Sequence, residues 1–225
     1  MHISSLPGKY GIGDFGKEAY NFVDFLKIAQ QKNWQILPLG VTGYGDSPYQ
    51  CFSAFAGNPY FIDLDELIDL RYLYQDEVNN LDLGKNPECV DYGLLYENKM
   101  KLLRIAYGRA KENLAKELTD FYLEHNDWLR DFALFMSLKA KNNNTSWVHW
   151  NENFRDFKSN EVLDFEKTNQ DEIFFWVFTQ YFFLKQWLKL KKYANEKGIN
   201  IIGDLPIYVA EDSSDVCGNP SIFNL

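Results

Sequence analysis

The sequence predicts an α/β fold with a parallel sheet, because at two places a helix leads directly into a short buried strand. The first pair is a helix over residues 15–32 and a strand over residues 34–39. The second is a helix from about residue 171 to 197 and a strand over residues 199–203. Both strands end in polar loops. Since an α/β barrel builds its active site on the loops after its strands, we expect these loops to carry the function.

The first helix is predicted from a stripe of apolar residues at helical spacing: Phe15, Ala19, Phe22, Leu26 and Ala29. Asn33 can end this helix as a left-handed cap. The strand that follows is an apolar run that Pro38 and Gly40 close, too short for a helix.

The loop over residues 40–49 is rich in turn-forming residues. Its polar and aromatic side chains are Tyr44, Asp46, Ser47 and Tyr49, and Pro48 lies between the last two. A tyrosine ring can face the apolar side of a sugar while its hydroxyl meets a sugar oxygen. The alternative is an ordinary connection whose tyrosines pack on the rim of the sheet. The residues alone favour neither interpretation.

Residues 66–166 read as a helical insertion, because the stretch is too long for a single crossover. Helices are predicted there over about residues 94–122 and 127–141, the second with Asp127 accepting from its first-turn amides. We therefore expect three parts: residues 1–65 as the first part of a barrel with a substrate-binding loop, residues 66–166 as the insertion, and residues 167–225 as the barrel continuation.

The last helix has acidic residues at its start and lysines at its end, and Gly198 can terminate it. Asp204 follows the next strand. It is either a sugar-binding or catalytic carboxylate or an acceptor for nearby loop amides. The acidic residues Glu211, Asp212 and Asp215 are expected in a solvated turn, with ligand contact as the alternative. His149, between two tryptophans, is expected in a packed aromatic loop, with the lining of a ligand subsite as the alternative.

The composition limits the classes of binding partner that this chain can be expected to have. The 225 residues carry a net charge of −9, which disfavours nucleic acid and anionic membranes. The cysteines Cys51, Cys89 and Cys217 suggest neither a disulfide framework nor a zinc site, so we expect a cytoplasmic protein. We expect no metal and no cofactor, since the histidines are scattered and the P-loop Lys-Ser/Thr pair and the G-x-S-x-G elbow do not occur. A neutral, oxygen-rich ligand remains.

Five motifs, in order, closely resemble the 4-α-glucanotransferase family, also called amylomaltase or disproportionating enzyme, of the α-amylase clan. They are HISSLPGKYGIGD at residues 2–14, WQILPLG at 34–40, GYGDSPYQ at 43–50, FSAFAGNP at 52–59 and IIGDLPIYVA at 201–210. The resemblance implies a (β/α)8 TIM barrel with helical insertions, of which this chain would hold about the first three strands. It also implies transfer of α-1,4-glucan segments between maltooligosaccharides by a retaining reaction without a cofactor.

By the same resemblance, Tyr49 would pack on the sugar at the subsite where the bond breaks, with Ser47 and Pro48 beside it. Asp204 would hydrogen-bond hydroxyls of that sugar. The family's nucleophile and acid/base carboxylates would lie beyond Leu225, so none of these residues is catalytic. Val41 and Cys217-Gly218 also depart from the family pattern. The chain therefore reads as a fragment that is inactive alone, with a non-catalytic glucan-binding fragment or an incomplete gene product as the alternative.

Overall fold

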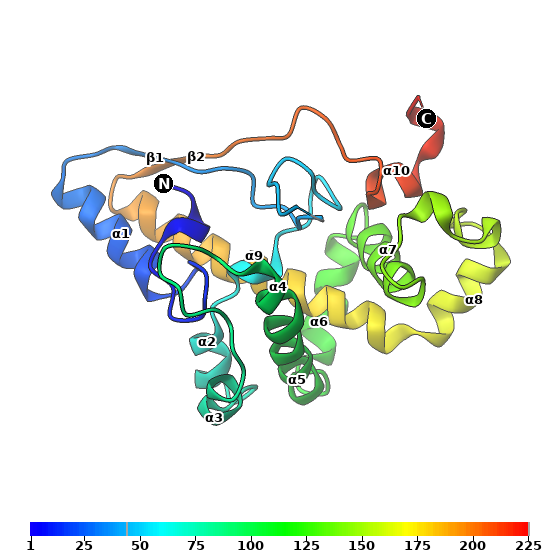
Figure 1. The fold of residues 1–225 in the computed structure, drawn as a ribbon, viewed down its shortest axis with the longest axis horizontal. Helices are drawn as coiled ribbons and strands as arrows, with labels where there is room; N and C mark the ends of the chain where they lie inside the picture. The colour runs from blue at the N-terminus through cyan, green and yellow to red at the C-terminus, as the bar shows by residue number, and fades with distance from the viewer. Residues whose placement is uncertain (44, 225) are drawn as a thin grey trace. The chain divides into compact units, whose positions relative to one another are not determined.

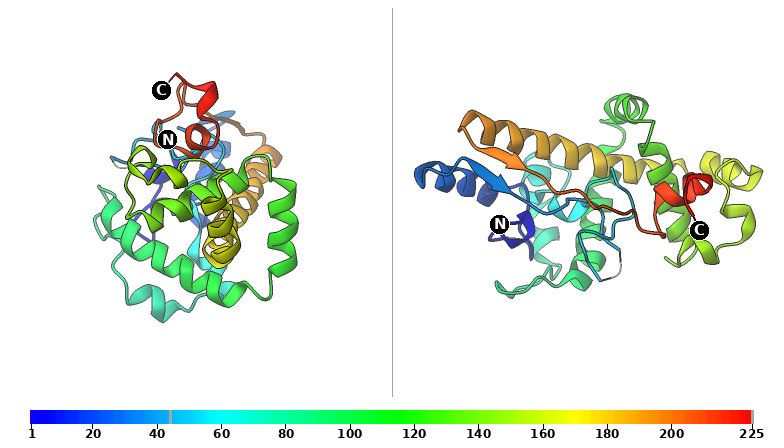
Figure 2. Two further views of the ribbon diagram at one scale, coloured as in Figure 1. Left: turned by 90° about the vertical axis from the view of Figure 1, so that its right-hand side faces the viewer. Right: turned by 90° about the horizontal axis from the view of Figure 1, so that it is seen from above.

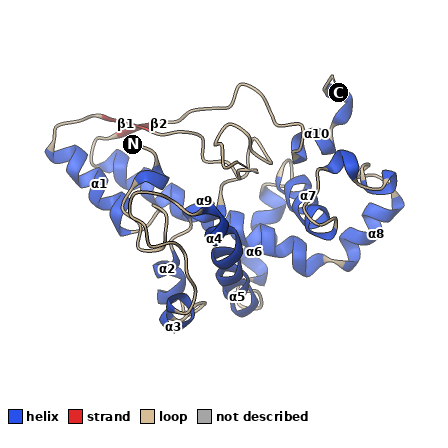
Figure 3. Ribbon diagram, viewed as in Figure 1, coloured by secondary structure: helices blue, strands red, loops and turns tan. Residues whose placement is uncertain are grey.

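The computed structural model describes residues 1–43 and 45–224, so Tyr44 lies outside the described residues. Helices make up most of its regular structure (Figures 1 and 3). The helices are α1 Lys17–Ile28, α2 Leu64–Asp69, α3 Gln75–Asn79, α4 Tyr92–Leu94, α5 Met100–Ala110, α6 Ala115–Glu124, α7 Leu129–Lys141, α8 Asn160–Thr168, α9 Gln170–Glu196 and α10 Ser214–Gly218. The strands are β1 Asn33–Gln35 and β2 Asn200–Ile202. Single helical turns are η1 Ile3–Ser5, η2 Pro59–Phe61, the π-turn η3 Leu95–Lys99, η4 Trp147–His149, η5 Glu152–Phe154 and η6 Pro220–Ile222.

The chain divides into two compact units. Unit 1 consists of Met1–Pro38, Asn58–Leu114 and Tyr181–Leu205, and unit 2 of Leu39–Gly57, Ala115–Gln180 and Pro206–Leu225. Helix α9 gives its first residues to unit 2 and the remainder to unit 1. The three parts expected from the sequence divide the chain differently, and they stay a prediction.

In unit 1, β1 and β2 form a parallel pair, as the two helix–strand repeats predict (Figure 2, right). Trp34 lies opposite Ile201, and the amide of Ile36 extends the ladder to the carbonyl of Ile202 over 3.0 Å. The strands are shorter than expected, and the described residues form two strands where about three were expected. The turn η2 begins after Asn58, which caps it by accepting from the amide of Tyr60.

The end of α1 differs from the prediction. Gln30, with φ 55°, takes the left-handed conformation, and Asn33 already belongs to β1. The amide of Gln31 bonds to the carbonyl of Leu26 over 2.9 Å and that of Gln30 to Lys27 over 3.1 Å, the pattern of a Schellman motif. The prediction for Asn33 is wrong. Asparagine tolerates the left-handed conformation better than glutamine does, but α1 ends at Ile28, so Gln30 takes that conformation and not Asn33.

The end of α9 is as predicted. Gly198 has φ 79°, and the amide of Ile199 bonds to the carbonyl of Ala194 over 2.9 Å. The chain thus turns at Gly198 and enters β2 directly, which places Asp204 just past that strand.

The predicted helical regions of the insertion are present, with more interruptions than expected. Residues 94–122 hold the end of α4, the π-turn η3, α5 and most of α6. Helix α7 has Trp128 at its N-cap position without a side-chain cap, so the cap expected from Asp127 is wrong. The backbone carbonyl of His125 accepts from Leu129 over 2.9 Å instead. Among residues 1–43 and 45–224, none of the helices is both long and apolar enough to cross a membrane.

Candidate functional site

The candidate site in unit 2 is the loop Leu39–Gly57, called here the Tyr49 loop. Its two limbs run antiparallel, with bridges between Gly40 and Gly57 and between Thr42 and Cys51. The amide of Phe52 donates to the carbonyl of Val41 over 2.8 Å. A Cβ at Gly40 would lie 2.5 Å from the sulfur of Cys51, so the close approach of the limbs requires glycine there.

The tip of this loop carries the sequence-predicted residues Ser47, Pro48 and Tyr49. The amide of Gln50 donates to the carbonyl of Ser47 over 3.1 Å, closing a turn that contains Pro48 and Tyr49. The amide of Tyr49 also reaches the hydroxyl oxygen of Ser47 over 3.4 Å. Ser47 and Pro48 are half-buried, whereas the side chain of Tyr49 is 45% exposed. The turn therefore presents the tyrosine ring toward solvent.

The base of the loop is buried. The hydroxyl of Ser53, itself 3% exposed, accepts from the amides of Phe55 and Ala56 over 3.1 and 3.3 Å. Gln180 of α9 binds both polar groups of Gly57, accepting from its amide over 2.7 Å and donating to its carbonyl over 2.9 Å. Burial raises the pKa of the Cys51 thiol to about 11, so this cysteine is a packed thiol at neutral pH. The loop thus has an exposed tyrosine at its tip and a buried, hydrogen-bonded backbone at its base.

Asp212 and Asp215 do not lie in a solvated turn, which corrects the expectation for these two residues. Asp212 forms an ion pair of 2.6 Å with Lys139 of α7, whose side chain is 5% exposed. Its other carboxylate oxygen accepts from the amide of Trp147 over 3.3 Å. Asp215 is also half-buried, and burial raises its pKa. Glu211 is exposed.

The aromatic loop around His149 is packed as expected. Trp147 and Trp150 are 7% and 1% exposed, and His149 is exposed. The indole of Trp147 donates to the carbonyl of Glu211 over 2.7 Å, and that of Trp150 to the carbonyl of Thr145 over 3.1 Å. Both tryptophan nitrogens therefore bond within unit 2.

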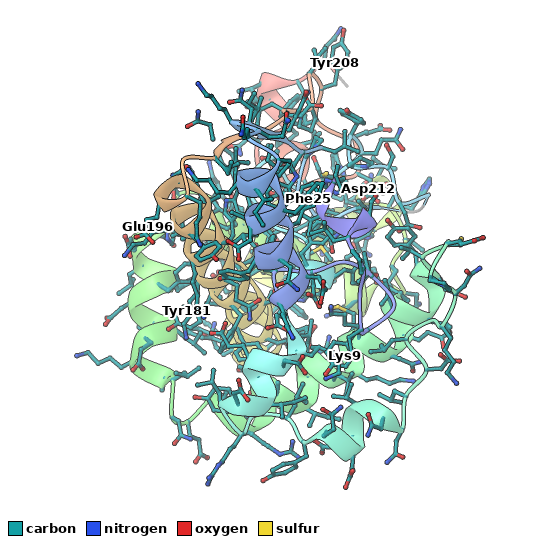
Figure 4. All side chains as sticks on the ribbon, turned by 90° about the vertical axis from the view of Figure 1, so that its left-hand side faces the viewer. Lys9, Phe25, Tyr181, Glu196, Tyr208 and Asp212 are labelled. Atoms are coloured by element: carbon teal, nitrogen blue, oxygen red, sulfur yellow. The ribbon has the colours of Figure 1, made fainter. Side chains whose placement is uncertain are left out.

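Asp204 belongs to unit 1, where it follows β2 and is half-buried. Ser47, Pro48 and Tyr49 share one loop of unit 2, whereas Asp204 belongs to unit 1. The segment beyond it is open to solvent: Leu205, Ile207 and Tyr208 are 82%, 89% and 82% exposed, and Tyr208 projects away from the ribbon in Figure 4.

The glycine-rich motif at residues 2–14 has a structural part in unit 1. Gly11 has φ 79°, and a Cβ there would lie 1.6 Å from the carbonyl oxygen of Leu83. His2 accepts from the amide of Leu37 over 3.2 Å through Nδ1, and its burial, with the charged N-terminus, lowers its pKa to about 4. His2 is therefore a neutral acceptor beside β1. Within the described residues, no group of three or more His, Cys, Asp or Glu side chains could hold a metal ion.

Sequence reasoning missed Gln180 and Lys139 and misassigned Asp212 and Asp215. A polar residue inside the apolar run of α9 and a lysine inside α7 are the only local signals, because the partners of all four lie far along the chain. The bond of Asp215 to the Tyr49 loop, for example, joins residues 161 positions apart.

Comparison with solved structures shows that this chain has the fold of part of an amylomaltase. Amylomaltase from Streptococcus agalactiae in complex with acarbose superposes with a TM-score of 0.94 and 45% sequence identity, over 100% of this chain and 46% of that one. Amylomaltase from Corynebacterium glutamicum, at 21% identity and a TM-score of 0.68 over 96% of this chain and 31% of that one, shares the fold.

The chain belongs to the 4-alpha-glucanotransferase family, whose model matches residues 1–225. It is 52% identical over 225 residues to the 4-alpha-glucanotransferase of Clostridium butyricum, covering 100% of this chain and 46% of that protein. It is 44% identical over 229 residues to that of Thermus thermophilus, covering 100% and 45%. The chain thus spans about half the length of the curated relatives it matches.

Proposed function

We propose that this chain is part of a 4-α-glucanotransferase that moves α-1,4-glucan segments between maltooligosaccharides with retention. The observation that carries the proposal is the family match along the whole chain, together with the likeness to an amylomaltase structure that contains acarbose. A retaining transfer needs a carboxylate nucleophile, an acid/base and exclusion of water from the intermediate. The residues assigned below bind sugar and do not supply these catalytic groups.

The fold proposed for the complete catalytic unit is a (β/α)8 barrel. The parallel pairing of β1 and β2, each preceded by a helix that ends just before it, supports this assignment. In a barrel, the loops after β1 and β2 would both belong to the substrate side. The Tyr49 loop and Asp204 follow these two strands along the chain.

Tyr49 is proposed to pack its ring on a glucose unit, with Ser47 and Pro48 shaping the turn that presents it. Support comes from its exposure in a loop whose base is buried and hydrogen-bonded. Such an arrangement keeps the cost of ordering the loop low when sugar binds. Asp204 is proposed to accept hydrogen bonds from sugar hydroxyls.

Two buried, unbridged cysteines, Cys51 and Cys217, fit a reducing cytoplasm.

Titration with maltoheptaose, followed by tryptophan fluorescence, tests the binding roles. We expect saturable binding by the chain and an affinity roughly tenfold weaker for Tyr49→Ala, equivalent to about 1.4 kcal/mol. The matched control is Tyr74→Ala, which removes a tyrosine that is 55% exposed on unit 1. Asp204→Ala is expected to weaken binding as well. A chain that does not respond to maltoheptaose, or a Tyr49→Ala variant that binds like the control, contradicts the assignment.

The alternative, a glucan-binding piece without transferase activity, is favoured by the same loop, since the tyrosine turn needs no carboxylate pair to bind sugar. Release of glucose from maltotriose measures transfer by these 225 residues directly, and it would contradict the proposal that the catalytic carboxylates are not among them. We expect binding without release for this chain by itself.

A further inference from the structure

The segment after β2 returns to the Tyr49 loop and bonds to its backbone. The amide of Ser214 donates to the carbonyl of Phe52 over 2.8 Å, and the Ser214 hydroxyl donates to the same oxygen over 3.1 Å. Asp215 accepts from the amide of Ala54 through Oδ2 over 2.9 Å. All these residues belong to unit 2. Three hydrogen bonds thus join two segments that are about 160 residues apart in sequence.

This segment is itself firmly held. Ser213 is fully buried, and its hydroxyl accepts from the amide of Val216 at the start of α10. The ion pair between Asp212 and Lys139 ties the segment to α7, and the Lys139 ammonium lies 4.8 Å from the centre of the Phe52 ring. Lys139 therefore contacts both the segment and the loop that the segment bonds to.

We propose that Ser214 and Asp215 are positioning residues for glucan binding, which fix the backbone of Phe52 and Ala54 and through it the direction of Tyr49. The inference rests on the proposed role of the Tyr49 loop. Neither residue is assigned a contact with sugar. They act as a latch, defined here as Ser214 and Asp215 with their three hydrogen bonds to the loop.

The loop has the connections needed to carry this restraint to its tip. Phe52 pairs with Val41 through its amide, and Cys51 bridges Thr42. The Cys51 sulfur then donates to the carbonyl of Pro48 over 3.1 Å, directly before Tyr49. A continuous set of short-range contacts therefore runs from the latch to the tyrosine turn.

Without the latch, the loop would keep its own ladder but lose the three hydrogen bonds that orient it on α10. A loop that samples more orientations must be ordered on binding, and that cost appears as weaker affinity. The latch thus predicts a loss of glucan binding in a variant that remains folded.

The test compares Asp215→Ala with Asp215→Asn by amide hydrogen exchange in unit 2 and by maltoheptaose titration. Alanine removes the acceptor for the Ala54 amide, whereas asparagine keeps a carbonyl oxygen there. We expect Asp215→Ala to exchange the Ala54 amide at least tenfold faster and to bind maltoheptaose at least fivefold more weakly. Asp215→Asn should remain within about twofold of the parent chain in both. Asp164→Ala, at an exposed position of α8 in the same unit, is the matched control.

Ser214→Ala provides a second variant in case Asp215→Ala does not fold, since it removes one of two bonds to the Phe52 carbonyl and leaves the other. It should weaken maltoheptaose binding in the same direction. If the parent chain binds maltoheptaose and Asp215→Ala or Ser214→Ala binds equally well, the latch is refuted and the proposed function stands. If the parent chain itself does not bind, the glucan-binding role fails and the latch with it, whatever the exchange rates.

Discussion

At the scale of single residues, the least expected feature is a buried lysine. Lys99, in the π-turn of unit 1, is fully buried, and its ammonium donates to the carbonyl of Tyr60 over 2.7 Å. Burial lowers its pKa, and the charges of Asp14 and Asp63 oppose that shift. Burial also raises the pKa of Asp14 to about 6, although Lys99 acts in the other direction. The attraction between Lys99 and the two carboxylates therefore has to offset the cost of burying these charges in a low-dielectric interior.

Asp14→Asn tests the cost of burying this carboxylate. A folded-state pKa of about 6 lies above the ordinary pKa of an aspartate, 3.8, so Asp14 favours folding fully below about pH 4 and loses that contribution as pH rises to about 6. The loss corresponds to about 3 kcal/mol. Relative to the variant, the wild-type chain should therefore become less stable over this window in urea unfolding followed by circular dichroism.

Asp164→Asn, at an exposed site on α8, serves as control and should show no such trend relative to wild type. The offset between Asp14→Asn and wild type at any one pH also contains the lost attraction to Lys99. The slope with pH is for that reason the decisive quantity. A stability difference that stays flat from pH 4 to 6.5 contradicts a raised pKa at Asp14.

At the scale of elements, α9 does more than pack its apolar surface. Two glutamines six positions apart each bind the polar groups of one residue 123 positions upstream. Gln180 binds Gly57 within unit 2. Within unit 1, Gln186 accepts from the amide of Asp63 over 2.8 Å and donates to its carbonyl over 3.3 Å. These glutamines are 1% and 2% exposed, so the helix supplies buried hydrogen-bond partners to the backbone of one residue in each of two loops.

Gln180→Leu should remove this support from Gly57. Leucine preserves much of the side-chain volume but leaves one buried amide and one buried carbonyl without their partner, at roughly 1–3 kcal/mol each. We expect the free energy of unfolding in urea to fall by about 2–6 kcal/mol. Gln170→Leu, at an exposed position of the same helix, should change it by less than about 0.5 kcal/mol. Equal effects at the two positions would show that the hydrogen bonds of Gln180 do not stabilise the fold.

At the scale of the whole molecule, each unit has its own core, and the parallel sheet of unit 1 is small. Parallel strands are normally covered on both faces. Here Ile202 of β2 is 47% exposed and Leu205 just beyond it is 82% exposed. Ile207, which belongs to unit 2, is 89% exposed. We expect the exposed apolar stretch that follows β2 along the chain to favour association between copies of the chain.

Leu205→Lys should reduce association of the chain with itself. A charge in this stretch opposes the pairing of apolar segments from two copies. Sedimentation velocity over a range of concentrations measures the effect, and we expect a larger monomer fraction than for wild type. Leu123→Lys, which places the same charge at an isolated leucine that is 65% exposed, should leave the association unchanged. Identical sedimentation of all three chains would rule out this stretch as the contact.

The local features of the fold could be predicted because they are written in neighbouring residues. The run around Trp34 and the stop at Gly198 each act within one turn or one strand, and the structure contains both. The apolar stripe of α1 is present in part, since Ala19 and Leu26 are buried, whereas Ala29 is exposed beyond the end of the helix and Val23 is buried in its place. The prediction that Asn33 caps α1 failed because intrinsic preference for the left-handed conformation is weaker than the length that packing sets for a helix. Likewise, Asp127 has the chemistry of a cap but lies one residue before the cap position of α7.

The sequence by itself determined the family, the order of helices and strands around the parallel pair, and the loop that contains Tyr49, because motifs and periodicity are properties of adjacent residues. Only the tertiary structure decided that Asp212 and Asp215 are bound groups, that Lys99 is buried, and that Gln180 supports a loop. Their partners are 39 to 161 positions away along the chain. A polar side chain becomes a structural one when folding removes water from it and supplies a distant partner, and no local pattern records that exchange.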